Sequence, residues 1–306
     1  MASALRHVSD TAHWVAMYRA LESERPDALF TDPWARRLAG PRGEAILRQL
    51  PGGRAGTWAL VIRTAIFDEV IARLVAEGGV RTVVNLASGL DARPFRMALP
   101  EALRWLDVDL PEMQAHKREV LGRERPSCRV EWLPADLADA GARREVVARA
   151  AEGPGPALAV TEGLLIYLDD AAVAALGAEL RATATVRWWL TDLASPLLLG
   201  LLAQGWGRSV AAADAPFRFA PRDAPAFFAR LGWREADYRS TWEESVRLGR
   251  TFPLGGALGV AWRRAAPLYP AWLREGIRRL SGVALLARGD AAPAVTARAA
   301  PSARAR

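Results

Sequence analysis

The 306-residue sequence has few of the residue types that build disulfides and metal sites. It contains a single cysteine, Cys128, and three scattered histidines, His7, His13 and His116. A disulfide within the chain needs two cysteines, and zinc sites need suitably spaced cysteine or histidine ligands. We therefore expect no intrachain disulfide and no metal site.

Long hydrophobic runs are also missing. The longest apolar stretch lies near residues 196–203, which is much shorter than the ~20 residues that cross a bilayer. Residues 1–10 lack the apolar segment of a secretory signal. These features predict a soluble, cytoplasmic protein without a membrane partner.

Lysine is almost absent: Lys117 is the only one, and arginine supplies the rest of the basic charge. Lysine and arginine number 41 against 34 acidic residues, which gives a formal net charge of +7. Most arginines are mixed with acids and do not form a basic patch, so we expect no nucleic-acid partner. The sequence also lacks a Gly-x-Ser-x-Gly elbow and a Walker loop, which leaves serine hydrolysis and P-loop nucleotide hydrolysis without support.

Apolar residues make up 51% of the chain, and their spacing changes along it. Residues 8–50 have a helical, amphipathic pattern, and a strong helix is predicted from Thr57 to the stop at Gly78 and Gly79. Short apolar runs alternating with helical patterns then predict a parallel sheet with right-handed crossovers. The expected strands are 81–86, 103–108, 129–134, 157–161 and 186–193, with 233–240 and a stretch near 252–262 completing the sheet.

These patterns divide the chain into three parts. We predict a helical cap over 1–56 and a main domain over 57–286. A lid insertion is expected at 196–222, which is rich in Leu, Gly, Ala and Phe. Residues 287–306 are rich in Ala, Arg and Pro, and we expect them to form a disordered tail.

A turn of small residues follows the first expected strand. Ala87, Ser88 and Gly89 lead to Asp91 and then to a helix. Small side chains let a ligand approach the backbone, and a helix N-terminus offers free N–H groups. Alone this is a weak signal, because many α/β proteins have such a turn for packing only.

Acidic residues end the next two strands. Asp109 lies 20 residues after Gly89, where an acid can accept both hydroxyls of a ribose. Asp107 is the alternative on the same strand. Asp136, beside Leu137, is placed to accept from an adenine amino group, although by this pattern alone an N-cap of the following helix is the preferred role.

Glu162 and Tyr167 follow the fourth strand, at the carboxyl edge where open α/β sheets bind ligands. A buried aromatic with a satisfied hydroxyl is the alternative for Tyr167. Arg63, in the helix before the first strand, has the fork that pairs with a carboxylate, although by pattern alone such an arginine is more often a surface residue.

Five motifs in order resemble the leucine carboxyl methyltransferase family, and more closely its bacterial branch with polyketide carboxyl O-methyltransferases of the tetracenomycin type. The matching stretches are 10–40, 83–96, 105–117, 135–137 and 161–168. The resemblance covers residues 8–260. It implies an α/β class I methyltransferase fold, doubly wound, with a mostly parallel seven-stranded sheet, a helical N-terminal cap and a lid. It also implies S-adenosylmethionine as cofactor and S-adenosylhomocysteine as product.

The resemblance also implies roles for single residues at the methionine end of the cofactor. Arg63 matches the arginine that holds the methionine carboxylate, and Arg19, in the cap, lies roughly where the family has a second basic group for that carboxylate. Glu162 matches the carboxylate near the amino group. Tyr167 lies close to the transfer site.

For the nucleoside end, the resemblance implies that the turn from Ala87 through Ser88 to Gly89 and on to Asp91 passes under the cofactor. Asp109 matches the ribose-binding acid, with Asp107 as the alternative, and Asp136 and Leu137 match the adenine contacts. The family usually has glycine where this chain has Ala87.

The predicted function is O-methylation of a small-molecule acceptor. A carboxylate acceptor needs no general base, and no histidine stands in the motif region, which favours a carboxylate over a phenolic hydroxyl. One alternative is a nicotinamide-dependent dehydrogenase, although Ala87, Gly89 and Ala92 only imitate its glycine motif. The other is a non-catalytic regulatory protein that binds the cofactor. The sequence leaves the oligomeric state open.

Overall fold

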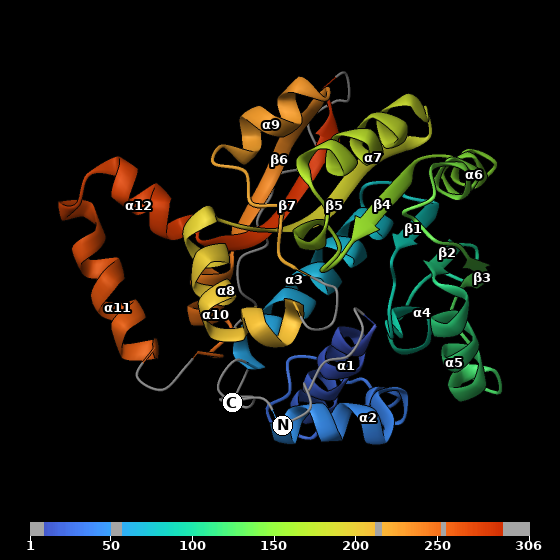
Figure 1. Ribbon diagram of the computed structural model, residues 1–306, viewed down its shortest axis with the longest axis horizontal. Coiled ribbons are helices and arrows are strands. Elements are labelled where there is room, and N and C mark those ends of the chain that lie inside the picture. The colour runs from blue at the N-terminus through green and yellow to red at the C-terminus, as the bar shows by residue number, and fades with distance from the viewer. Residues whose placement is uncertain (1–8, 50–56, 212–215, 252–254, 290–306) are drawn as a thin grey trace.

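The computed structural model describes residues 9–49, 57–211, 216–251 and 255–289 (Figure 1). Its centre is a seven-stranded sheet in the order β3-β2-β1-β4-β5-β7-β6. Strand β7 is antiparallel to both of its neighbours, and all the other neighbouring pairs are parallel. The strands are β1 (Thr82–Leu86), β2 (Arg104–Asp109), β3 (Arg129–Pro134), β4 (Ala157–Thr161), β5 (Val186–Ala194), β6 (Trp233–Ser240) and β7 (Ser281–Arg288). The predicted doubly wound, mostly parallel sheet is confirmed.

The sheet carries a hydrophobic core on each face. Every residue of β1 and β4 is buried, as expected for central strands covered on both sides. One face packs against α3 (Thr57–Ala76). The other packs against α6 (Ala140–Ala151), α7 (Asp170–Ala182) and α9 (Ala224–Arg230). Two short helices, α4 (Arg93–Arg96) and α5 (Pro111–Leu121), follow β1 and β2.

The cap consists of α1 (Asp10–Ser23) and α2 (Ala35–Gln49). Helix α2 is kinked at Gly40, which has φ 57°, directly before Pro41. Apolar residues of both cap helices pack against the loop after β1 and against α5. The cap is therefore joined to the sheet domain at the edge where β1 and β2 end.

Further insertions follow strands that end at the same edge. Helix α8 (Pro196–Ala211) follows β5, and α10 (Thr241–Arg247), α11 (Gly255–Ala265), η2 (Ala266–Leu268) and α12 (Ala271–Arg278) lie between β6 and β7. Figure 1 shows α11 and α12 projecting to one side of the sheet. Three of the most exposed large apolar side chains belong to this projection: Leu258, Leu268 and Trp272.

Two expectations about the end of the chain were wrong. The stretch expected as a strand near 252–262 forms α11 from Gly255 onward, and residues 252–254 lie outside the described residues. The seventh strand is β7, and it includes Ala287 and Arg288, which we had assigned to the tail. Ala287 is fully buried because β7 is inserted between β5 and β6. Residues 290–306, the rest of the predicted tail, lie outside the described residues.

Candidate active site

The turn after β1 and the acid at the end of β2 lie in direct contact. The backbone N–H of Gly89 donates to Asp109 at 2.6 Å, and that of Leu110 donates to the other carboxylate oxygen at 2.8 Å. Burial raises the pKa of Asp109, and these two N–H groups oppose the rise. Ala87 has φ 51°, the only positive φ of a non-glycine among the residues the structure describes. This conformation explains why glycine is expected at position 87.

Asp107 has a different environment. It is fully buried beneath the turn, where it pairs with Lys117 at 2.8 Å and accepts from Ser88 Oγ at 2.6 Å. Gln114 donates to the same carboxylate at 2.9 Å. All of these groups are inside the protein, so Asp107 and Lys117 hold the turn against α5. These contacts favour a structural role for Asp107, whereas Asp109 is partly exposed and remains the candidate acid for binding a ligand.

Asp91 is also enclosed. Arg93 Nη1 donates to it at 2.7 Å, and Asn85 Nδ2 donates at 2.9 Å. Burial alone would raise its pKa, but the guanidinium groups of Arg93 and Arg96 hold the pKa well below the usual range. Asp91 therefore stabilises the start of α4 and the end of β1 as an ionised buried acid.

A second group of charges lies where β4 and β5 end. Arg63 Nε donates to Glu162 at 3.1 Å, and Arg63 Nη1 donates to Asp192 at 3.1 Å. Arg93 pairs with the other oxygen of Glu162 at 2.8 Å. The Arg63 side chain is only 15% exposed, so it is not a surface residue but is held between the ends of β4 and β5.

The charged network continues from Arg93 to the cap. Asp68 pairs with both Arg93 and Arg96 at 2.7 Å, and Arg96 approaches Asp32 of the cap at 3.6 Å. Arg19 donates to Asp32 at 2.9 Å and also to the carbonyl of Leu90. Arg19 thus ties the cap to the loop after β1. No described contact joins it to Arg63, so the two predicted carboxylate-binding arginines are not brought together.

Tyr167 lies in η1 (Leu165–Tyr167), under the cap. Its ring packs against Phe217 with 5.8 Å between centroids, and against the buried cluster of Trp14, Tyr18 and Ile46. Burial raises the pKa of Tyr167, while a hydrogen bond with Thr11 opposes the rise. The hydroxyl therefore keeps its proton at neutral pH.

The predicted adenine contacts, Asp136 and Leu137, closely follow β3, the outermost strand on one side of the sheet. Asp136 is exposed and accepts from the backbone N–H of Ala138 at 2.9 Å. Asp139 is the residue that caps α6, by accepting from Ala142 at 2.7 Å, so Asp136 does not have the N-cap role. Leu137 packs against the core and is half-buried.

Sequence reasoning missed Asp192 and the roles of Lys117 and Arg93. Asp192 lies two residues before the end of β5, which is parallel to β4, so it is also an acid near the carboxyl edge of the sheet. Lys117 carried a visible signal as the single lysine among 40 arginines. The partners of Arg93 have no signal in the sequence, because they are set by tertiary contacts.

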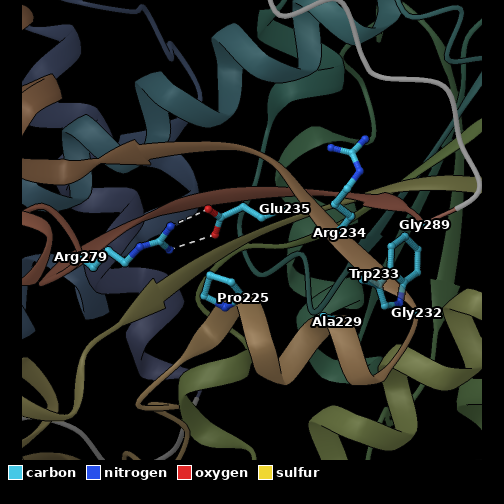
Figure 2. A pocket seen from close by; sticks show the side chains of 8 residues that line it. All are labelled: Pro225, Ala229, Gly232, Trp233, Arg234, Glu235, Arg279 and Gly289. Atoms are coloured by element: carbon cyan, nitrogen blue, oxygen red, sulfur yellow. Dashed lines mark hydrogen bonds and ion pairs between the residues drawn. The ribbon is translucent and has the colours of Figure 1, made fainter.

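A pocket of about 510 Å3 lies away from this edge, along the outer strand β6 (Figure 2). Its two facing charges, Glu235 and Arg279, pair with each other at 2.6 Å. The pocket contains none of the predicted site residues. We therefore place the candidate site by its charge arrangement at the carboxyl edge of the sheet. Over the described residues, no group of three or more His, Cys, Asp or Glu is placed to hold a metal ion, and no helix is long and apolar enough to cross a membrane.

Comparisons with known proteins identify the family of the chain. The family model described as leucine carboxyl methyltransferase matches residues 12–180. A Streptomyces coelicolor protein is 33% identical over 272 residues, which cover 78% of this chain and 87% of the relative. A Frankia alni protein is 34% identical over 286 residues, which cover 83% and 94%. Both relatives carry the provisional name S-adenosyl-L-methionine-dependent methyltransferase.

Solved structures share the fold at low sequence identity. A Thermobifida fusca protein, provisionally described as a methyltransferase, aligns with a TM-score of 0.55 at 15% identity and covers 93% of this chain and 96% of its own. A DUF574 family protein from Streptomyces avermitilis aligns with a TM-score of 0.54 at 13% identity and covers 90% and 96%. At such identities the likeness supports the fold alone.

Proposed function

Because the chain belongs to the leucine carboxyl methyltransferase family, we propose that it transfers a methyl group from S-adenosylmethionine to an oxygen of a small organic acid. The observation that carries the proposal is the presence of two charge arrangements at one edge of the sheet. Asp109 lies against the Gly89 turn, and Arg63 lies between Glu162 and Asp192.

The first arrangement suits a nucleoside. A carboxylate has about four lone-pair positions, and two of those on Asp109 are taken by backbone N–H groups. The remaining positions can accept the two ribose hydroxyls. Asp136 and Leu137, one strand further out, are then placed to contact the adenine ring.

The second arrangement suits a zwitterionic amino acid, which needs a cation and an anion close together. Arg63 has the planar fork that matches a carboxylate, and Glu162 lies 3.1 Å from it to receive an ammonium group. In this proposal Arg19 contributes by holding the cap over the loop after β1, through Asp32 and Leu90.

When bound, S-adenosylmethionine supplies an electrophilic sulfonium methyl group. The residues of the chain bind and orient the reactants and exclude water, which is the main requirement of this reaction. Tyr167 keeps its proton and can donate a hydrogen bond to an acceptor oxygen, but it is not a base. An ionised carboxylate acceptor needs none, so this environment favours a carboxylate over a phenolic hydroxyl. Phe217 beside Tyr167 gives the acceptor an aromatic surface.

The two alternatives are not favoured. A dehydrogenase of this type needs the glycine motif in the turn, where this chain has Ala87 in a left-handed conformation. A regulatory protein without catalysis is not favoured, because the matching family model and the two relatives are all described as methyltransferases.

Two measurements test the proposal. Calorimetry with S-adenosylmethionine and S-adenosylhomocysteine should show binding, with NADH as the negative control. Transfer of a labelled methyl group to a panel of aromatic and polyketide-like acids and phenols should then show the acceptor. Mild alkali releases the label from a methyl ester but not from an aryl ether, so alkali-stable product would refute the carboxylate assignment. The absence of binding by either cofactor form at millimolar concentration would refute the whole proposal.

A further inference from the structure

We propose that Asp192, at the carboxyl end of β5, is a positioning residue for the amino-acid part of the cofactor, because it fixes the direction of the Arg63 fork. The inference rests on the proposed function. It adds a residue that neither the motifs nor the family resemblance identified.

Asp192 makes two contacts, one with each carboxylate oxygen. One oxygen accepts from the backbone N–H of Gly163 at 2.7 Å, and the other accepts from Arg63 Nη1 at 3.1 Å. The register of the sheet pairs Thr161 with Thr191, which places Asp192 beside Glu162 on the neighbouring strand. The carboxylate therefore joins the end of β4, the end of β5 and helix α3.

Arg63 is held from three directions as a result. Glu162 accepts a hydrogen bond from its Nε, Asp192 accepts one from its Nη1, and the backbone of Gly163 lies against the flat guanidinium. The contact with Gly163 is close, since a Cβ at this position would lie 3.2 Å from Nη1 and 3.4 Å from Nη2. Gly163 also has φ 70°, which favours glycine there.

Arg63 has five N–H donors, and the described contacts use one on Nε and one on Nη1. No described residue hydrogen-bonds to Nη2, so its two N–H groups and the second N–H of Nη1 can serve a ligand carboxylate. A fork recognises a carboxylate only when its plane points the right way. Without Asp192, only the bond to Glu162 and the packing of Gly163 would orient the guanidinium, and the N–H of Gly163 would lose its acceptor as well.

The helix that carries Arg63 offers a matched control. Further along α3, Arg73 pairs with Asp237 of β6 at 3.3 Å, so it too is an α3 arginine paired with a strand aspartate. Neither residue touches the candidate site. Asp237→Asn therefore measures the general cost of weakening such a pair.

The experiment compares Asp192→Asn and Asp237→Asn in the full chain with two ligands. S-adenosylhomocysteine contains the amino-acid part, and 5′-methylthioadenosine lacks it. We expect Asp192→Asn to weaken binding of S-adenosylhomocysteine about tenfold or more, and to change binding of 5′-methylthioadenosine by less than about twofold. Asp237→Asn should leave both affinities unchanged. Asp192→Glu, which keeps the charge but moves it by one methylene, should behave like Asp192→Asn.

The possible outcomes are distinguishable. If Asp192→Asn weakens both ligands equally, the residue has only a general structural role and the inference is refuted. Unchanged binding of S-adenosylhomocysteine also refutes it, while leaving the proposed function intact. A parent protein that binds neither ligand refutes the proposed function itself. If Asp192→Asn does not fold, the ratio of the two affinities in Asp192→Glu decides in the same way.

Discussion

Replacing Ala87 with glycine tests whether the turn after β1 holds strain. With φ 51°, the alanine adopts a left-handed conformation that costs an L-residue about 1–2 kcal/mol. Glycine removes this cost but adds about 0.4–1 kcal/mol of conformational entropy to the unfolded chain. The methyl group is half-buried and belongs to no core cluster, so its loss costs little. We expect Ala87→Gly to raise the free energy of unfolding by about 0.5–1 kcal/mol.

Calorimetry or denaturant unfolding measures this change, which corresponds to a rise of about 1–2 °C in Tm for a chain of this size. The matched control is Ala92→Gly, because Ala92 has φ −117° and is fully buried. The same chemical change there relieves no strain and should destabilise the protein by about 1 kcal/mol. If Ala87→Gly lowers Tm as much as the control does, the turn is not strained.

The same variant has a consequence for the proposed cofactor. A glycine at 87 allows a closer approach of ligand to backbone, so the affinity for S-adenosylhomocysteine should stay the same or increase. A loss of affinity larger than about tenfold would mean that the Ala87 methyl group is itself part of the binding surface.

Three further predictions concern the charged groups. Asp109→Ala should weaken cofactor binding by about ten- to a hundredfold with little loss of stability. Asp107→Ala should instead cost about 3–5 kcal/mol in unfolding experiments, since it leaves buried Lys117 unpaired; the reverse pattern would exchange their roles. Arg63→Lys keeps the charge but loses the fork, so calorimetry should show weaker cofactor binding in a folded protein, and binding within about twofold of the parent would remove Arg63 from the site. Burial lowers the pKa of His13 in the folded state. The folded state therefore binds a proton at His13 less readily than the unfolded state does. This group leaves the free energy of unfolding intact above the unfolded pKa of about 6.5 and lowers it as pH falls below that value. His13→Gln should reduce this loss in denaturant titrations between about pH 8 and pH 5, and an unchanged pH slope would contradict the assignment.

The local pattern of the chain was enough to predict most of the fold. The five parallel strands before residue 195 were predicted within one or two residues of their observed ends. Each strand is a short apolar run between turn residues, and in the helices between them apolar residues recur every three to four positions. The contact between Gly89 and Asp109 agrees with their spacing, because consecutive parallel strands of one sheet bring their carboxyl ends together.

Other parts of the fold depend on contacts between distant segments. Strand β7 was missed because α10, α11, η2 and α12 separate it in sequence from β6, and its place between β5 and β6 is set by pairing with those two strands. Its last two residues, Ala287 and Arg288, match the Ala- and Arg-rich composition of the segment that follows. Burial between two neighbouring strands, which composition does not reveal, makes them part of the sheet.

By itself, the sequence determined the class of fold, the family and the residue types available at the carboxyl edge. Only the tertiary structure decided which of those residues are partly exposed at this edge and which are buried and paired inside the protein. Asp107 and Asp109 are alike in sequence, yet one pairs with Lys117 inside the protein and the other faces the turn. Arg63 and Asp192 are 129 positions apart, and their pairing follows from the packing of α3 across the ends of β4 and β5. The spacing of apolar residues describes only neighbours along the chain, whereas the orientation of a buried charged side chain is set by partners that folding brings to it.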